Sequence, residues 1–143
     1  MEPAQKDDAK LHKYSSCSSG SNSVSCPTPV PGFPVVVDSI NDPSCPVPGL
    51  NRCVPEQLSN ATAAIDDTHP KAHVYVAFAE NTMVGNDDII VRQANDEGLT
   101  WDGVPKVLVN TLGIARSFMP WIIRAGDAAL VSWYDRPSCL RRS

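Results

Sequence analysis

The sequence predicts an all-β fold, and three observations support this assignment. Segments rich in β-branched and aromatic residues recur at short intervals, and clusters of Asp, Asn, Gly and Pro separate them. No segment keeps the 3.6-residue apolar spacing of a helix before a turn signal interrupts it. The same pattern of segments also repeats along the chain at offsets of 55–58 residues.

The first part of the chain is expected to hold little of the core. Nine of the 13 prolines and four of the five cysteines lie in residues 1–57, whereas seven of the nine aromatic residues lie in 58–143. Residues 1–31 are rich in Ser, Pro and Cys and have no apolar periodicity, so they are predicted to be a disordered lead-in. Within this part only 33–38, FPVVVD, has the chemistry of a strand.

Beyond residue 58 the pattern changes to short strands joined by turns. Four of them are expected to form an antiparallel meander, at 60–66, 73–80, 88–94 and 101–110. The repeat predicts two more strands, because 59–65 aligns with 117–123 at an offset of 58 and 74–79 aligns with 129–134 at an offset of 55. The second hairpin loop is therefore expected to be three residues shorter than the first.

The strand at 33–38 aligns with the last strand of the meander, which makes it the end of a preceding unit. Four-stranded units arranged radially form a β-propeller, which needs about 4–8 of them to close. The sequence thus predicts antiparallel four-stranded meanders in a partial β-propeller of about one and a half to two blades. The expected divisions are the lead-in at 1–31, a preceding strand and Cys-rich loop at 32–58, one complete blade at 59–110, and the first two strands of the next blade with a tail at 111–143.

Composition argues against two classes of partner. The 12 Lys+Arg against 16 Asp+Glu give a formal net charge of −4, without the basic face that a nucleic-acid-binding protein normally has. No run approaches the roughly 20 apolar residues of a membrane span, and the first residues lack the apolar core of a secretory signal. We therefore expect neither a nucleic acid nor a membrane as partner.

A turn motif in the complete unit resembles that of a known family. Residues 94–101, ANDEGLTW, resemble the Asp-box, or bacterial neuraminidase repeat, whose pattern is Ser-x-Asp-x-Gly-x-Thr-Trp. Asp96, Gly98, Thr100 and Trp101 fit this pattern, and Ala94 stands at the position of the leading Ser. We expect a structural hairpin, in which Asp accepts backbone N–H bonds, Gly takes a positive φ and Trp packs against the blade edge.

Two further segments, 116–122 and 131–136, look like those that follow an Asp-box in sialidase-like propellers. The resemblance implies a secreted or otherwise extracytoplasmic parent protein that is an exo-acting glycoside hydrolase. Such enzymes hold the sugar carboxylate with arginines and use a Tyr activated by Glu as nucleophile and an Asp as acid/base. Their site needs groups from several blades, so this chain alone is expected to be inactive.

Catalytic candidates under that resemblance are Arg116, Tyr134, Asp135 and Arg136, with Arg124 nearby in the sequence. The competing interpretation is structural: Tyr134 packs against its neighbours, and Asp135 forms a surface ion pair with Arg136 or Arg124. Surface ion pairs of this kind contribute little to stability. The Arg-Ile-Pro motif of sialidases is absent, and Phe118-Met119-Pro120 is the nearest match.

Two non-catalytic functions remain open for such a chain. One is a propeller module that binds a glycan or a protein on its loop face. The other is a self-assembling fragment, in which exposed strand edges of two or three copies pair in a homo-oligomer.

Metal or cofactor binding is not expected from the sequence. His12, His69 and His73 do not indicate a zinc site, and His73 is expected to be a partly buried strand residue. The acidic clusters at 66–67 and 86–88 have the oxygen ligands that calcium prefers, but hairpin turns are the better interpretation of both.

Cysteines and a glycosylation motif complete the candidates. Neighbouring cysteines in loop-like sequence suggest disulfides between Cys17 and Cys26 and between Cys45 and Cys53, each of which would close a short ring of the chain. Cys139 is left over, and reduced thiols are the alternative. The acceptor motif Asn60-Ala61-Thr62 lies on an expected inner strand, so it is expected to be unused.

Overall fold

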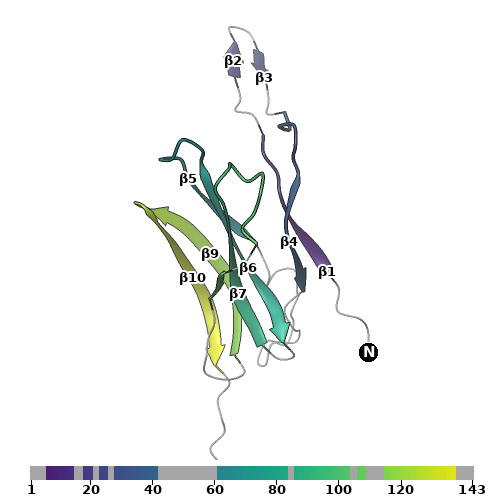
Figure 1. Cartoon of the computed structure of the whole chain (residues 1–143), viewed down its shortest axis with the longest axis vertical. Helices are drawn as coiled ribbons and strands as arrows, with labels where there is room; N and C mark the ends of the chain where they lie inside the picture. The colour runs from purple at the N-terminus through teal and green to yellow at the C-terminus, as the bar shows by residue number, and fades with distance from the viewer. Residues whose placement is uncertain are drawn as a thin grey trace, which may run out of the picture.

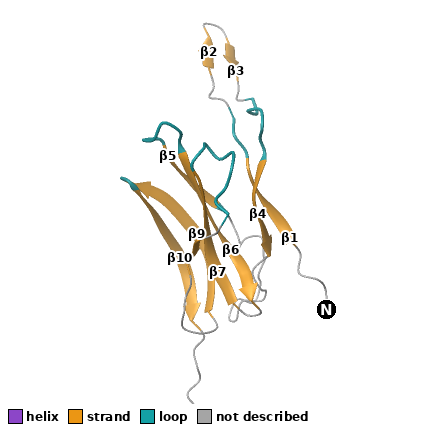
Figure 2. Ribbon diagram, viewed as in Figure 1, coloured by secondary structure: helices purple, strands orange, loops and turns teal. Residues whose placement is uncertain are grey.

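The computed structural model describes residues 6–14, 18–20, 23–25, 28–41, 61–83, 86–103, 106–108 and 115–137. All regular structure in these ranges is β-strand, and no sheet closes on itself (Figures 1 and 2). The predicted all-β class with antiparallel sheets is therefore confirmed. Within the same ranges there is no helix with the length and apolar character that crossing a membrane requires.

Within the described ranges, ten strands make up three hydrogen-bonded sheets. In chain order they are β1 (Lys6–Leu11), β2 (Ser18–Gly20), β3 (Ser23–Ser25), β4 (Val35–Asn41), β5 (Thr62–Asp66), β6 (His73–Met83), β7 (Asn86–Ala94), β8 (Lys106–Leu108), β9 (Ala115–Ala125) and β10 (Ala128–Pro137). β1 pairs with β4, β2 pairs with β3, and the other six strands form one network.

Strands β5 to β8 form the predicted antiparallel meander, since each pairs with the next along the chain. β9 and β10 form a hairpin that is joined to the meander at one parallel pair, Asp87 with Arg116. Apart from that link, the hairpin lies over one face of the meander, because β9 contacts β5 and β6 as well as β7. The hydroxyl of Thr62 bridges the two layers, donating to the Pro120 carbonyl and accepting from the N–H of Ile122.

The core lies on both faces of the meander. Side chains alternate along β6, so Phe78 points to one face and Ala77 to the other. The first face packs against β4 and β1 in a cluster of Val37, Ile40, Val74, Val76, Phe78, Ile90 and Ala94, with Ala9, Leu11 and Trp101 at its margin. The second face packs against β9 and β10 in a cluster of Ala64, Ala77, Val91 and Ile122, with Tyr75, Ala129 and Val131 at its margin.

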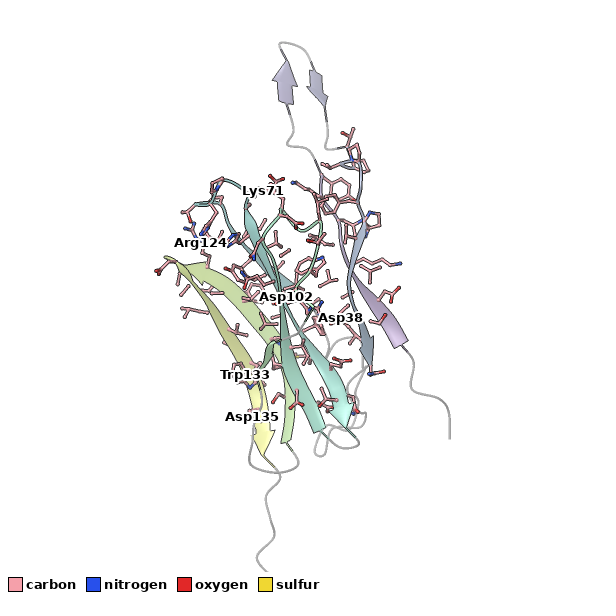
Figure 3. The ribbon with its side chains drawn as sticks, in the orientation of Figure 1. Asp38, Lys71, Asp102, Arg124, Trp133 and Asp135 are labelled. Carbon is pink, nitrogen blue, oxygen red and sulfur yellow. The ribbon has the colours of Figure 1, made fainter. Side chains whose placement is uncertain are left out.

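The result is three stacked layers, β1–β4, then β5–β8, then β9–β10, which Figure 1 shows from right to left. One buried cation joins the first two layers. The Arg92 side chain of β7, only 12% exposed, donates to Asp38 of β4 at 3.1 Å and to the carbonyl of Asp102 at 2.6 Å. Asp38 and Asp102 accordingly lie on either side of the interface in Figure 3.

The N-terminal segment differs from the prediction. Residues 1–31 were expected to be disordered, but β1 pairs with all of β4, and β2 and β3 form a short hairpin. Composition misled here because only two apolar side chains, Ala9 and Leu11, are needed to anchor β1 to the core. Asp8 and Lys10 of β1 are exposed, and the hydroxyl of Ser39 donates to the Asp8 carboxylate at 2.8 Å.

Both segment pairs matched by the internal repeat form hairpins, β5–β6 and β9–β10, but their packing gives a different value for one of the two offsets. At an offset of 58, Ala64 aligns with Ile122. The two side chains face each other across the same interface, however, because Ala64 points to the following layer, β9–β10, and Ile122 points to the preceding layer, β5–β8. The residue of β5 that corresponds to Ile122 in strand register and in side-chain direction is Ala63, which gives an offset of 59. The hairpin loops agree, since the first spans 67–72 and the second spans 126–127, four residues fewer rather than three.

Replacing Phe78 by alanine is expected to lower the free energy of unfolding by about 3–5 kcal/mol, because the ring is fully buried between two layers and its loss leaves a cavity. Urea denaturation followed by tryptophan fluorescence measures the change. The matched control is Val36→Ala in β4, where the side chain is 49% exposed and a change below about 1 kcal/mol is expected. Equal losses in the two variants would contradict the two-sided core.

Candidate functional site

Functional side chains gather at the two opposite ends of the stack. The turn end carries the β5–β6 loop, the turn after β7 and the β9–β10 turn, because successive strands run antiparallel. The open end carries the start of β9 and the end of β10, beside the start of β7. Arg124 and Lys71 mark the turn end in Figure 3, and Trp133 and Asp135 lie toward the open end.

The Asp turn, residues 96–101, has the hydrogen bonds expected of its motif. One oxygen of Asp96 accepts the N–H groups of Leu99 and Thr100 at 3.0 and 2.9 Å, and the other accepts the Thr100 hydroxyl at 2.6 Å. The bonds from Thr100, followed by the one from Leu99, hold the pKa of Asp96 below its ordinary value. The turn is thus closed by one ionised side chain.

Glycine is required in this turn for two reasons. Gly98 has a φ of +88°, which disfavours any side chain. A Cβ at Gly98 would also lie 2.4 Å from the Cδ2 atom of Leu11, so Leu11 of β1 rests directly on the turn. Trp101 packs against the neighbouring core cluster as expected, with its indole N–H buried and without a partner in the described part of the chain.

Contacts of the Asp turn tie it to other segments. The N–H of Glu97 donates to the Ala72 carbonyl at 3.0 Å, and the Glu97 carboxylate pairs with Lys13. On the outgoing side, Asp102 exchanges two hydrogen bonds with Gln93 at 2.9 and 3.0 Å. These contacts support a structural role and place no reactive group in the turn.

At the open end, the register brings the four catalytic candidates together on two paired strands. Arg116 lies opposite Arg136, and Asp135 lies opposite Ser117. The side chains of both arginines lie outside the described residues. Tyr134 is 67% exposed and stacks on Phe118 at 5.9 Å between ring centroids. Its hydroxyl has no carboxylate partner in the described ranges, so the Tyr–Glu pair of a sialidase is not assembled there.

Two carboxylates are buried beside these candidates. Asp87 and Asp88 are the second and third residues of β7 and are 1% and 4% exposed. Asp87 accepts the amide of Asn81 at 3.0 Å, and Asp88 accepts the Thr82 hydroxyl. The cluster 86–88 is expected in a turn, although Asp88 also begins the predicted strand 88–94. The structure places Asp87 and Asp88 in β7, where each finds its partner across the β6–β7 pair.

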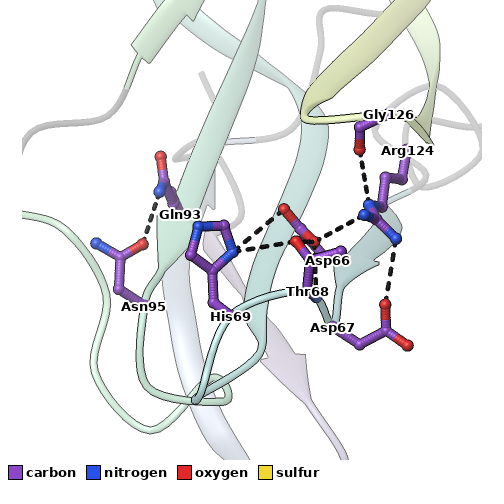
Figure 4. A network of polar contacts seen from close by, with 8 residues as sticks. All are labelled: Asp66, Asp67, Thr68, His69, Gln93, Asn95, Arg124 and Gly126. Carbon is purple, nitrogen blue, oxygen red and sulfur yellow. Dashed lines mark hydrogen bonds and ion pairs between the residues drawn. The ribbon is translucent and has the colours of Figure 1, made fainter.

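Arg124 lies at the turn end and pairs with different acids from those expected. It contacts Asp66 and Asp67, each at 3.2 Å, and donates to the Gly126 carbonyl at 2.9 Å (Figure 4). The alternative that paired Arg124 with Asp135 is therefore wrong, because the two residues lie at opposite ends of the hairpin. Asp66 also forms the expected turn, accepting the N–H and hydroxyl of Thr68 at 3.0 and 2.6 Å.

Histidines at the turn end come together in a way that the sequence analysis missed. His73 is a partly buried strand residue, as predicted, and its ring stacks on that of His69 with 3.9 Å between centroids. Both histidines lie near Asp66. Among the residues that the structure describes, these three form a group whose donor atoms could share a metal ion. The signal that could have found them is the four-residue spacing of His69 and His73 across a hairpin loop.

Several candidates cannot be placed. Asn60 and the five cysteines, Cys17, Cys26, Cys45, Cys53 and Cys139, lie outside the described residues. Three cavities of about 120, 110 and 220 Å³ border the described strands and the Asp turn. Each is smaller than the roughly 300–1,000 Å³ of a typical ligand pocket.

Comparisons with protein-family models, with curated proteins and with solved structures give no match for this chain.

The carboxylate of Asp96 makes the stability of the Asp turn depend on pH. Because its folded-state pKa lies below the ordinary 3.8, its contribution is present above that value and is lost as pH falls through the lower, folded-state pKa. We expect Asp96→Asn to reduce the fall in melting temperature between about pH 5 and pH 2. The control is Asp127→Asn in the exposed β9–β10 turn, and equal pH profiles for the two variants would contradict the assignment.

Proposed function

We propose that this chain is a non-catalytic binding segment of an Asp-box, sialidase-like β-propeller, and that it works by association through the outer face of β9–β10. The parent of such a segment would be an exo-acting glycoside hydrolase. Two observations support the architecture. Sheets stack face to face in a repeating order, and a turn of the expected hydrogen-bonding pattern follows the third strand of the central sheet.

An exposed apolar patch on the last layer carries the proposal. Ile122, Ala129 and Val131 point inward to the core, so their strand neighbours point outward by alternation. The outer patch comprises Trp121, Ile123, Leu130 and Tyr134, which are 62, 49, 54 and 67% exposed. Scattered apolar residues are ordinary on a surface, but four on one paired face mark an interaction site.

The repeat indicates what kind of surface this is. In the register established by packing, Trp121 and Ile123 correspond to Thr62 and Ala64, at the offset of 59. Ala64 is buried under the β9–β10 layer, and Thr62 hydrogen-bonds to it. The outer patch is therefore the equivalent of a face that is covered in the central sheet, and another β-layer is the occupant that fits it.

A second copy of this chain, related by a two-fold axis, is the occupant that we propose. The far end of the stack, the outer face of β1–β4, carries Asp8, Lys10 and Ser39 beside Val36. A head-to-tail contact would press those polar groups against the outer patch and remove them from water at a cost. Pairing the two outer patches buries apolar area on both sides and leaves the polar ends in solvent.

We expect the full chain to be a dimer by light scattering at micromolar concentration, and we expect Trp121→Ser with Ile123→Thr to shift it to monomer. The reason is the loss of apolar area from the centre of a contact that is used twice by symmetry. The control is Val36→Thr on the opposite outer face, which should stay dimeric. A monomeric wild type, or a dimer that resists the double substitution, would contradict the proposal.

A glycan is the second candidate for the outer patch, because Trp121 and Tyr134 offer exposed aromatic faces. Glycan-array binding by a monomeric wild type, lost on Trp121→Ala, would favour it over self-association. The residues that the family resemblance suggests as catalytic are tested separately.

The isolated chain should show no turnover of a fluorogenic sialoside, since Tyr134 lacks a carboxylate partner in the described part of the chain. Turnover that persists through purification and disappears in Tyr134→Phe would overturn this expectation.

A further inference from the structure

The β5–β6 loop holds a group of side chains that the proposed association does not use. Asp66 is the last residue of β5, His73 is the first of β6, and the two lie directly opposite each other in the strand register. His69 comes from the loop between them. One donor atom from each of the three residues lies within 4.8 Å of the other two.

We propose that Asp66, His69 and His73 bind one divalent transition-metal ion, with zinc as the best match. Two imidazole nitrogens and one carboxylate oxygen form a ligand set that zinc accepts at about 2.0–2.2 Å, whereas calcium and magnesium prefer oxygen ligands alone. Three protein ligands leave a fourth position for water or for a small anion.

The two histidines already lie close together beside Asp66. Their rings stack 17° from parallel with centroids at 3.9 Å, so one ring has to turn for both nitrogens to face a shared ion. Nδ1 of His69 is 3.4 Å from Oδ2 of Asp66, close to the ligand spacing around a tetrahedral ion. His69 is 48% exposed on the loop, so it can close the remaining gap without disturbing the core.

The carboxylate of Asp66 is already oriented for this role. Its Oδ1 accepts the hydroxyl and N–H of Thr68 and contacts Arg124, which leaves Oδ2 directed at His69 (Figure 4). The side chain is only 4% exposed, and its bonds to Thr68 and its contact with Arg124 fix its direction.

The charges around the site affect its expected affinity for a metal ion. Asp66 and Asp67 attract a cation, while the Arg124 guanidinium, 3.2 Å from each of them, offsets part of that attraction. The half-exposed loop also leaves the ion in contact with water. These features are typical of a solvent-open site with an exchangeable ligand rather than of a closed structural zinc.

Isothermal titration of the full chain with zinc chloride tests the proposal. We expect one equivalent to bind, with affinity reduced at least about tenfold in His69→Gln and in His73→Gln and by about tenfold in Thr68→Val. Cobalt(II) should give a d–d spectrum that lacks a thiolate charge-transfer band, which separates this site from binding by cysteines. His12→Gln is the control, since that exposed residue lies on the β1 side of the stack, and it should bind as the wild type does.

Absence of zinc binding by the wild type would overturn the proposal, and so would unchanged binding in His69→Gln. That variant changes only a loop side chain, so it remains informative even if His73→Gln alters the fold, which circular dichroism would reveal. None of the three ligands lies on the outer patch, so this result is independent of the dimer test.

Discussion

Burial on both faces of the β6–β7 pair is the constraint on which the rest of the structure depends. Ala77, Phe78 and Ala79 follow one another in β6, and Ile89 and Ile90 do so in β7, yet none is more than 1% exposed. Because neighbouring residues of a strand point to opposite faces, this sheet is stable only with a layer on each side. The β1–β4 pair and the β9–β10 hairpin supply those layers, and Arg92 and Thr62 fix each layer to the meander through polar contacts.

Strands and turns were predictable from the sequence because their signals are local. The runs at 73–80 and 88–94 combine β-branched chemistry with flanking turn residues, and both became strands of the meander. The segment 6–11 was missed because its pairing with β4 and the burial of Leu11 depend on residues far along the chain. The one-residue error in the repeat has a similar cause, since letter similarity does not tell which face of a sheet a residue occupies.

The candidate sites also divide into those with local sequence signals, which could be predicted, and those that depend on long-range packing, which could not. The Asp turn could be inferred because its bonds run between residues three and four positions apart. The four-residue spacing of His69 and His73 is visible in the sequence, but their meeting with Asp66 is not, because the three residues come together only when β5 and β6 pair in one register. Arg124 joins that group from a third strand, and its partners are set by how β9 lies over β5, a property of packing between layers.

The contact between Gly98 and Leu11 bears on the order in which the chain acquires its structure. Lys13 pairs with Glu97 across 84 positions of sequence, and Leu11 sits on the turn that contains Gly98. Contacts between such distant positions form slowly, since a long loop must close before they stabilise anything. The contact of Leu11 with Gly98 requires the Asp turn to be closed, whereas the pairing of β1 with β4 does not. β1 precedes β7 and the Asp turn in the sequence, yet its contact with the turn depends on them.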